Sequence, residues 1–135
     1  MKNIVYLIED EKDIMYVYKT ALSGAGISVE PLASGKEAME KIEAVQAKKE
    51  EKPVLVLLDL VLPDINGLEI LNALRKHKET KDIPVFILSN YTSDALLNMT
   101  YIKPDKVFLK ATITPTMLVE EVRAQLAQQS AKSAK

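Results

Sequence analysis

The chain contains no cysteine and a single histidine among its 135 residues. Without cysteine there can be no disulfide, no cysteine-ligated zinc and no thiol nucleophile, although this leaves the cellular compartment undecided. The one histidine, His77, lies in a basic run at the end of an expected helix, so we interpret it as a surface residue. Any metal site in this chain is therefore expected to use oxygen ligands.

The chain also lacks a strong net charge and a long hydrophobic run. Its 18 basic and 19 acidic side chains leave a formal charge of −1, which gives no basis for a surface that binds nucleic acid or anionic membranes. Asp59 interrupts the longest apolar run well short of a membrane span, and the acidic residues 9–11 end the first apolar run too early for a signal peptide. We therefore expect a cytoplasmic protein.

Short apolar runs alternate along the chain with segments whose apolar residues recur at helical spacing. The runs that predict strands cover residues 3–8, 27–32, 53–59, 83–88 and 106–110. Helical spacing predicts helices over residues 14–25, 34–45, 68–78, 93–99 and 114–126, of which 93–99 has the poorest periodicity. A single domain over residues 1–128 is expected, followed by a polar, frayed tail at 129–135.

Local signals define some of the boundaries. Ser34 and Thr114 are residue types that cap helix N-termini, and Pro115 suits the first position of the last helix. Pro31 places the strand at 27–32 at an edge of the sheet, because a proline has no N–H to donate to a neighbouring strand. Five strands alternating with five helices indicate an α/β fold, an open, doubly wound parallel sheet with helices on both faces.

In such sheets the functional crevice lies beyond the carboxyl ends of the strands. The residues at these ends carry carboxylates, a hydroxyl and an ammonium group: Glu9, Asp10, Asp59, Ser89 and Lys110. Taken alone, Asp59 would be interpreted as a loop cap, but with an edge strand at 27–32 the other two carboxylates become its neighbours. Two unit charges about 5 Å apart repel by roughly 3 kcal/mol at an effective dielectric constant of about 20, so the cluster favours a cation.

All-oxygen ligands favour Mg²⁺ or a similar hard ion. A metal-neutralised carboxylate beside a hydroxyl and an ammonium group suits the oxygens of a transferring phosphoryl group. Asp59 would then be the nucleophile that forms an acyl phosphate.

These residues resemble the receiver domain of bacterial two-component response regulators, and the resemblance covers nearly the whole chain. The matching pieces are Ile8-Glu9-Asp10, Leu58-Asp59 followed by Pro63 and Asn66-Gly67, Leu88-Ser89, and Leu109-Lys110. Each match is short, but all occur in order and each stands at the end of its own strand. The resemblance implies a flavodoxin-like (βα)5 fold with strand order 2-1-3-4-5.

The resemblance also implies roles. Asp59 would accept a phosphoryl group from a phosphohistidine on a sensor histidine kinase or a histidine phosphotransfer protein. Asp10 and Asp59 would bind Mg²⁺ through their side chains, Glu9 directly or through water, and Val61 through its backbone carbonyl. Lys110 would pair with the phosphoryl oxygens.

Ser89 would hydrogen-bond the phosphoryl group and carry the switch to a target-binding face formed by residues 93–99, 106–110 and the last helix. Such a domain assists only its own phosphorylation and dephosphorylation and is no enzyme in the usual sense. We expect a monomer or weak homodimer.

Two departures from the family pattern concern the fifth strand. Ala111 follows Lys110 where a proline with a cis bond is usual, and a cis bond to a non-proline residue costs about 3–4 kcal/mol, which favours a trans bond. Val107 occupies the position of the usual switch aromatic, while Phe108 falls on the opposite face of the strand. These departures put the usual aromatic relay in doubt.

Three functions are compatible with these residues. The leading hypothesis is a stand-alone phosphoacceptor receiver, since no effector domain follows in this sequence. The second is a pseudo-receiver, an interaction module that works without phosphorylation, as the missing proline and aromatic suggest. The third, a small aspartate-nucleophile hydrolase, is disfavoured because no cap insertion or second acidic loop pair is present. Phosphorylation itself separates the first two hypotheses, and persistence of the phosphorylated form separates the first from the third.

Overall fold

The computed structural model describes residues 3–90 and 103–133. The helix predicted at 93–99 lies outside these residues. Within them, none of the helices is long and apolar enough to cross a membrane.

Five parallel strands form one sheet in the order β2-β1-β3-β4-β5, which confirms the predicted topology. The strands are β1 (Ile4–Ile8), β2 (Ser28–Leu32), β3 (Leu55–Asp59), β4 (Val85–Ser89) and β5 (Lys106–Leu109). All five residues of β3 and of β4 are buried, as their apolar runs predict for central strands. Pro31 lies in β2 at the edge of the sheet, where a missing N–H is tolerated.

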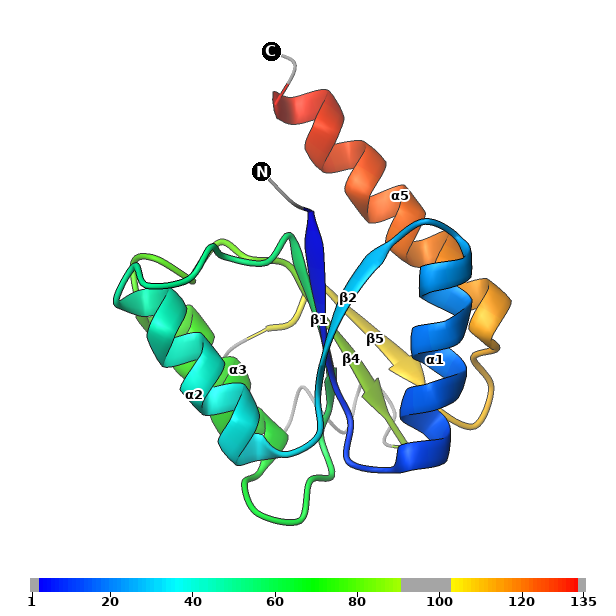
Figure 1. The fold of residues 1–135 in the computed structure, drawn as a ribbon, viewed down its shortest axis with the longest axis horizontal. Helices are drawn as coiled ribbons and strands as arrows, with labels where there is room; N and C mark the ends of the chain where they lie inside the picture. Colours follow the sequence, from blue (N-terminus) through cyan, green and yellow to red (C-terminus); the bar gives the residue numbers. More distant parts are fainter. Residues whose placement is uncertain (1–2, 91–102, 134–135) are drawn as a thin grey trace.

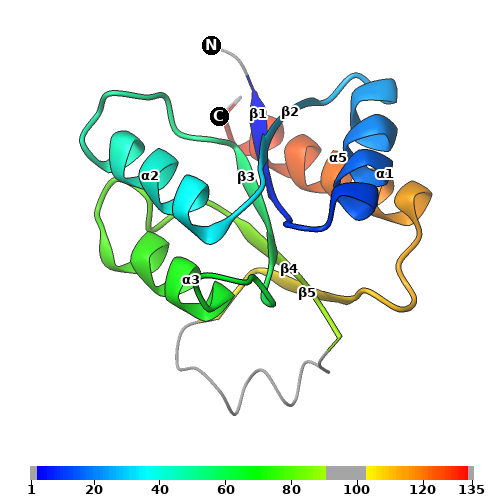
Figure 2. The ribbon, with the colours of Figure 1, turned by 60° about the horizontal axis from the view of Figure 1, so that its bottom comes forward.

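Helices cover both faces of the sheet: α1 (Lys12–Gly24) and α5 (Pro115–Ser133) one face, α2 (Gly35–Gln46) and α3 (Gly67–Lys76) the other (Figure 1). A view from a second direction shows the same two layers (Figure 2). The predicted caps are confirmed: Ser34 Oγ accepts a hydrogen bond of 3.1 Å from the Glu37 N–H, and Thr114 Oγ accepts one of 3.1 Å from the Met117 N–H.

The alternation of side chains along each strand divides the core into two clusters. On β3, Val56 and Leu58 pack with α2 and α3, whereas Leu55 and Leu57 pack with α1 and α5. All four of these side chains are fully buried. The sheet is thus closely packed on both faces, and this packing holds the polar groups at its carboxyl edge in place.

Residues 129–133 are not the frayed tail that we expected, because α5 continues to Ser133. Gln129 Nε2 donates a hydrogen bond of 2.8 Å to the Val54 carbonyl, which ties this part of the helix to the start of β3. Alanine and glutamine are also good helix formers, so nothing in this stretch ends the helix earlier. The last turns of α5 lie at the end of the molecule where β1 begins, away from the carboxyl edge of the sheet (Figure 1).

Candidate functional site

Asp59 is the last residue of β3 and lies at the centre of the carboxyl edge, between β1 and β4. It is only 2% exposed. Both carboxylate oxygens have partners: Oδ1 accepts a hydrogen bond of 3.1 Å from the Val61 N–H, and Oδ2 accepts one of 3.2 Å from Lys110 Nζ. These contacts fix the orientation of the Asp59 carboxylate.

Two more carboxylates converge on Asp59 from the end of β1. Ligand oxygens of Glu9, Asp10 and Asp59 all lie within 4.8 Å of one another, as the neighbouring positions of β1 and β3 predict. Glu9 is buried, and its Oε2 accepts a hydrogen bond of 3.1 Å from the Glu11 N–H, while Asp10 is half-buried. Glu11 stands at the N-cap position of α1, but its side chain makes no capping hydrogen bond.

Lys110 brings the only ammonium group that contacts this cluster among the described residues. Its Nζ lies 3.0 Å from Glu9 Oε1 and 3.2 Å from Asp59 Oδ2, and its side chain is 12% exposed. Burial alone would lower the pKa of Lys110, but the hydrogen bond with Glu9 and the charge of Asp59 outweigh burial and raise that pKa above its ordinary value. The lysine is therefore held in its charged form.

The cluster has an excess of negative charge. With all groups ionised, three carboxylates face one ammonium, which leaves two negative charges uncompensated. Burial raises the pKa of Glu9 from 4.5 to about 7, while the hydrogen bond with Lys110 opposes this rise and the charge of Asp59 adds to it. A bound cation would compensate this negative charge, and a set of oxygen ligands at this spacing fits a hard divalent ion.

A pocket of about 320 Å³ opens beside these groups and is lined by Asp10, Glu11, Asp59, Val61, Leu62, Pro63, Asn90 and Lys110. Val61 is 62% exposed at the pocket, so its side chain is available to a docking molecule. Ser89 ends β4 and is fully buried, and the Lys110 N–H donates a hydrogen bond of 2.8 Å to its carbonyl. The six predicted site residues, Glu9, Asp10, Asp59, Val61, Ser89 and Lys110, thus gather at one edge of the sheet, with Ser89 beneath its surface.

The trans peptide bond after Lys110 and the opposite directions of Val107 and Phe108 are confirmed. All peptide bonds within the described residues are trans, including Lys110–Ala111. Val107 packs on the side of α2 and α3, whereas Phe108 packs on the side of α1 and α5, with its ring 5.4 Å from that of Phe86 in an edge arrangement.

The sequence did not reveal how the loop after β3 is held. Gly67 donates a hydrogen bond of 3.0 Å to the Leu60 carbonyl, and a Cβ at position 67 would lie 2.6 Å from Leu60 Cα and 2.8 Å from the Asp59 carbonyl. Asp64, a residue of this loop, binds the first turn of α2. Gly67 belongs to the Asn66-Gly67 motif of the family resemblance, but no local pattern in the sequence predicts the contact of Asp64 with α2.

The chain matches the model of the response regulator receiver domain family over residues 5–123. It is 31% identical over 100 residues to the probable methanogenesis regulatory protein FilR2 of Methanothrix harundinacea, covering 73% of this chain and 64% of that protein. It is 35% identical over 89 residues to the regulatory protein VanRc of Enterococcus gallinarum, covering 66% of this chain and 35% of that protein. The chain thus spans less than two thirds of the length of these relatives.

Solved structures agree on the fold. The signal receiver domain of a putative Luxo repressor protein from Vibrio parahaemolyticus superposes with a TM-score of 0.79 at 20% identity, over 99% of this chain and 97% of that one. A CheY-like receiver domain protein from Methanospirillum hungatei gives 0.77 at 22% identity, over 98% and 99%. The Mn²⁺-bound form of the response regulator Rcp1 gives 0.75 at 22% identity, over 90% and 92%.

Proposed function

The chain belongs to the family of response regulator receiver domains, and on this premise we propose that it accepts a phosphoryl group on Asp59 in a Mg²⁺-dependent reaction. The observation that carries the proposal is the bridge from Lys110 to both Glu9 and Asp59 inside a cluster of three carboxylates. An ordinary buried ion pair needs one carboxylate, whereas phosphoryl transfer needs a nucleophile, a cation site and a positive group side by side.

The donor would be a phosphohistidine on a sensor histidine kinase or a histidine phosphotransfer protein. A carboxylate oxygen of Asp59 forms the new O–P bond while the N–P bond of the donor breaks, and the departing imidazole takes up a proton. Lys110, already 3.2 Å from Asp59 Oδ2, is within reach of the phosphoryl oxygens. Ser89, at the end of the neighbouring strand, would hydrogen-bond the same group.

The residues present suit a resident Mg²⁺. Glu9, Asp10 and Asp59 supply hard oxygen donors at suitable spacing, and the backbone carbonyl of Val61 would complete the protein ligands. When bound, the ion neutralises charge on the carboxylates and on the transferring oxygens. The Mn²⁺-bound form of Rcp1 supports a divalent cation in this fold.

The phosphorylated domain would signal in the cytoplasm, through a downstream protein that binds a face including β5 and α5. We propose a signalling domain with no substrate turned over beyond its own phosphoryl group.

The direct test is the intact mass of the protein after incubation with Mg²⁺ and a small phosphodonor such as acetyl phosphate. A single adduct that requires Mg²⁺ and is absent from Asp59→Asn supports the proposal. Lys106→Ala is a matched control, because this lysine of β5 pairs with Glu121 and leaves the site untouched.

The pseudo-receiver remains the second candidate because Val107 stands in the place of the switch aromatic. No adduct on the wild-type protein, together with no Mg²⁺ binding, would favour it over the phosphoacceptor.

A further inference from the structure

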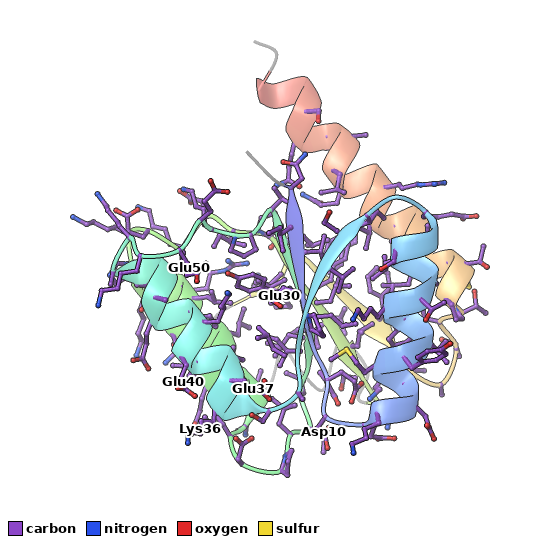
Figure 3. The ribbon with its side chains drawn as sticks, in the orientation of Figure 1. Asp10, Glu30, Lys36, Glu37, Glu40 and Glu50 are labelled. Carbon is purple, nitrogen blue, oxygen red and sulfur yellow. The ribbon has the colours of Figure 1, made fainter. Side chains whose placement is uncertain are left out.

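Asp64 joins the loop after β3 to the start of α2. Its Oδ1 accepts a hydrogen bond of 2.9 Å from the Gly35 N–H, and its Oδ2 accepts one of 2.8 Å from the Lys36 N–H. The first N–H groups of a helix have no acceptor within the helix, so a carboxylate from elsewhere in the chain satisfies them well. Asp10 and Lys36 lie at the same end of the molecule (Figure 3), so the first turn of α2 and the acidic cluster are at the same end.

The contact depends on glycine at position 35. A Cβ built on Gly35 would lie 2.7 Å from the Cβ of Ile65 and 2.9 Å from Asp64 Oδ1. Both distances are shorter than real Cβ contacts, so any side chain at position 35 would force the loop away from the helix. The loop and α2 therefore fit together only because this glycine lacks a side chain.

The same loop reaches the phosphoacceptor from its other end. The Val61 N–H donates to Asp59 Oδ1, and Gly67 fastens the end of the loop to the Leu60 carbonyl. Residues 60–66 are thus attached at Asp59, at α3 and, through Asp64, at α2. The hydrogen bond from the Lys36 N–H, with that from Gly35, holds the pKa of Asp64 below its ordinary value, in keeping with a charged clamp.

We propose that Asp64 is a positioning residue: its clamp on α2 holds the loop so that Val61 and Asp59 present their oxygens to the cation. This inference rests on the proposed function, since it concerns the same Mg²⁺ site. It assigns α2 a part in that site although α2 contributes no ligand to it.

A purely local role as a helix cap is the competing explanation, and the chain offers two matched variants that separate the two. Ser34→Ala removes the other cap of the same turn, whose hydrogen bonds among the described residues are with Glu37 and not with the loop. Gly35→Ala places a better helix former in α2 yet pushes Ile65 and Asp64 outward. Positioning predicts that Gly35→Ala weakens Mg²⁺ binding and that Ser34→Ala does not. A purely local cap predicts that neither variant changes Mg²⁺ binding, although both can change the melting temperature.

The experiment measures the Mg²⁺ dissociation constant of the full chain by calorimetry, together with the melting temperature of each variant. We expect Asp64→Ala and Gly35→Ala to weaken Mg²⁺ binding about tenfold, as loss of an outer partner typically does, and Ser34→Ala to leave it within about twofold. Equal affinities in Asp64→Ala and wild type would overturn the inference and leave the proposed function standing. A wild-type protein that binds no Mg²⁺ would overturn both the positioning role of Asp64 and the proposed function.

Amide hydrogen exchange gives a second readout that a structural cap would not move. Because coupling between two sites is reciprocal, Mg²⁺ should slow amide exchange at Gly35 and Lys36. The expected factor is the one by which loss of the clamp weakens Mg²⁺ binding. The Glu37 amide, held by Ser34, should not respond. Exchange at Gly35 and Lys36 that is indifferent to Mg²⁺ would contradict the inference.

Discussion

The two sides of the pocket are built differently. On the side of β1 and β3, buried carboxylates are held by backbone N–H groups: Glu9 by Glu11 and Asp59 by Val61. On the side of β5, no residue of the strand is fully buried, and Lys110 is held through its ion pairs. The first side is held in place by backbone hydrogen bonds, and the second contributes its positive charge from the end of a less buried strand.

This difference locates the departures of the sequence. Val107 and Ala111 both belong to the side of β5, whereas the acidic pair, Asp59 and the loop that follows match the family pattern. The carboxylates are held by backbone hydrogen bonds in one half of the pocket, and both departures from the family pattern lie in the other half. Four changes test this division, from the largest expected effect to the smallest.

Removing the ammonium group should have the largest effect. Lys110→Ala is expected to slow formation of the phosphoryl adduct about 100-fold, since it removes a largely buried positive charge 3.2 Å from Asp59. The time course of intact mass measures this. Adduct formation at the wild-type rate would show that Lys110 serves only the fold.

A methyl group added at position 67, on the side of β1 and β3, should lower the stability of the fold. Gly67→Ala is expected to lower the unfolding free energy by about 2 kcal/mol, because the new Cβ meets the backbone of Leu60 and Asp59, which cannot yield easily. Gly24→Ala is the control, since a Cβ there meets nothing within 4 Å. Equal stability of the two variants in urea titrations would contradict the tight packing of the loop.

The raised pKa of Glu9 should make Mg²⁺ binding depend on pH. A group with a pKa of about 7 is mostly protonated at pH 6, and the cation must displace that proton, so we expect affinity to rise about tenfold from pH 6 to pH 8. Glu9→Gln should abolish most of this rise. An unchanged slope in the variant would mean that another group titrates.

The same pKa has a consequence for the metal-free fold. The folded state binds more protons than the unfolded state between pH 4.5 and about 7. The stabilisation due to Glu9 is therefore fully present below pH 4.5 and is lost as the pH rises through 7.

The smallest effect concerns the aromatic ring of β5. Phe108→Leu is expected to cost about 1 kcal/mol through loss of the edge contact with Phe86, and to leave the rate of phosphorylation within about twofold. Thermal unfolding and the mass assay together check this. A large loss of rate would instead make Phe108 part of the site.

Local signals in the sequence predicted much of this structure. Ser34 and Thr114 cap their helices because capping needs only a side chain and an N–H a few residues away. Pro31 identified the edge strand, and the period of two along β5 placed Val107 and Phe108 on opposite faces. The strand order came from the family resemblance.

Contacts between distant parts of the chain were not predictable in this way. Asp64 meets partners 28 and 29 positions away, and Gln129 meets one 75 positions away, so neither leaves a pattern within a helix or strand. The Glu11 side chain makes no capping hydrogen bond, while the Glu11 N–H binds the Glu9 carboxylate, which points back toward it from the site.

The most direct test of the central claim is to locate the phosphoryl group. An acyl phosphate on aspartate is reduced by borohydride to homoserine, which a peptide mass map assigns to one position. Treatment with Mg²⁺ and acetyl phosphate before reduction should convert Asp59 alone, and omission of Mg²⁺ should prevent the conversion. Conversion at another carboxylate, or at none, would contradict the account.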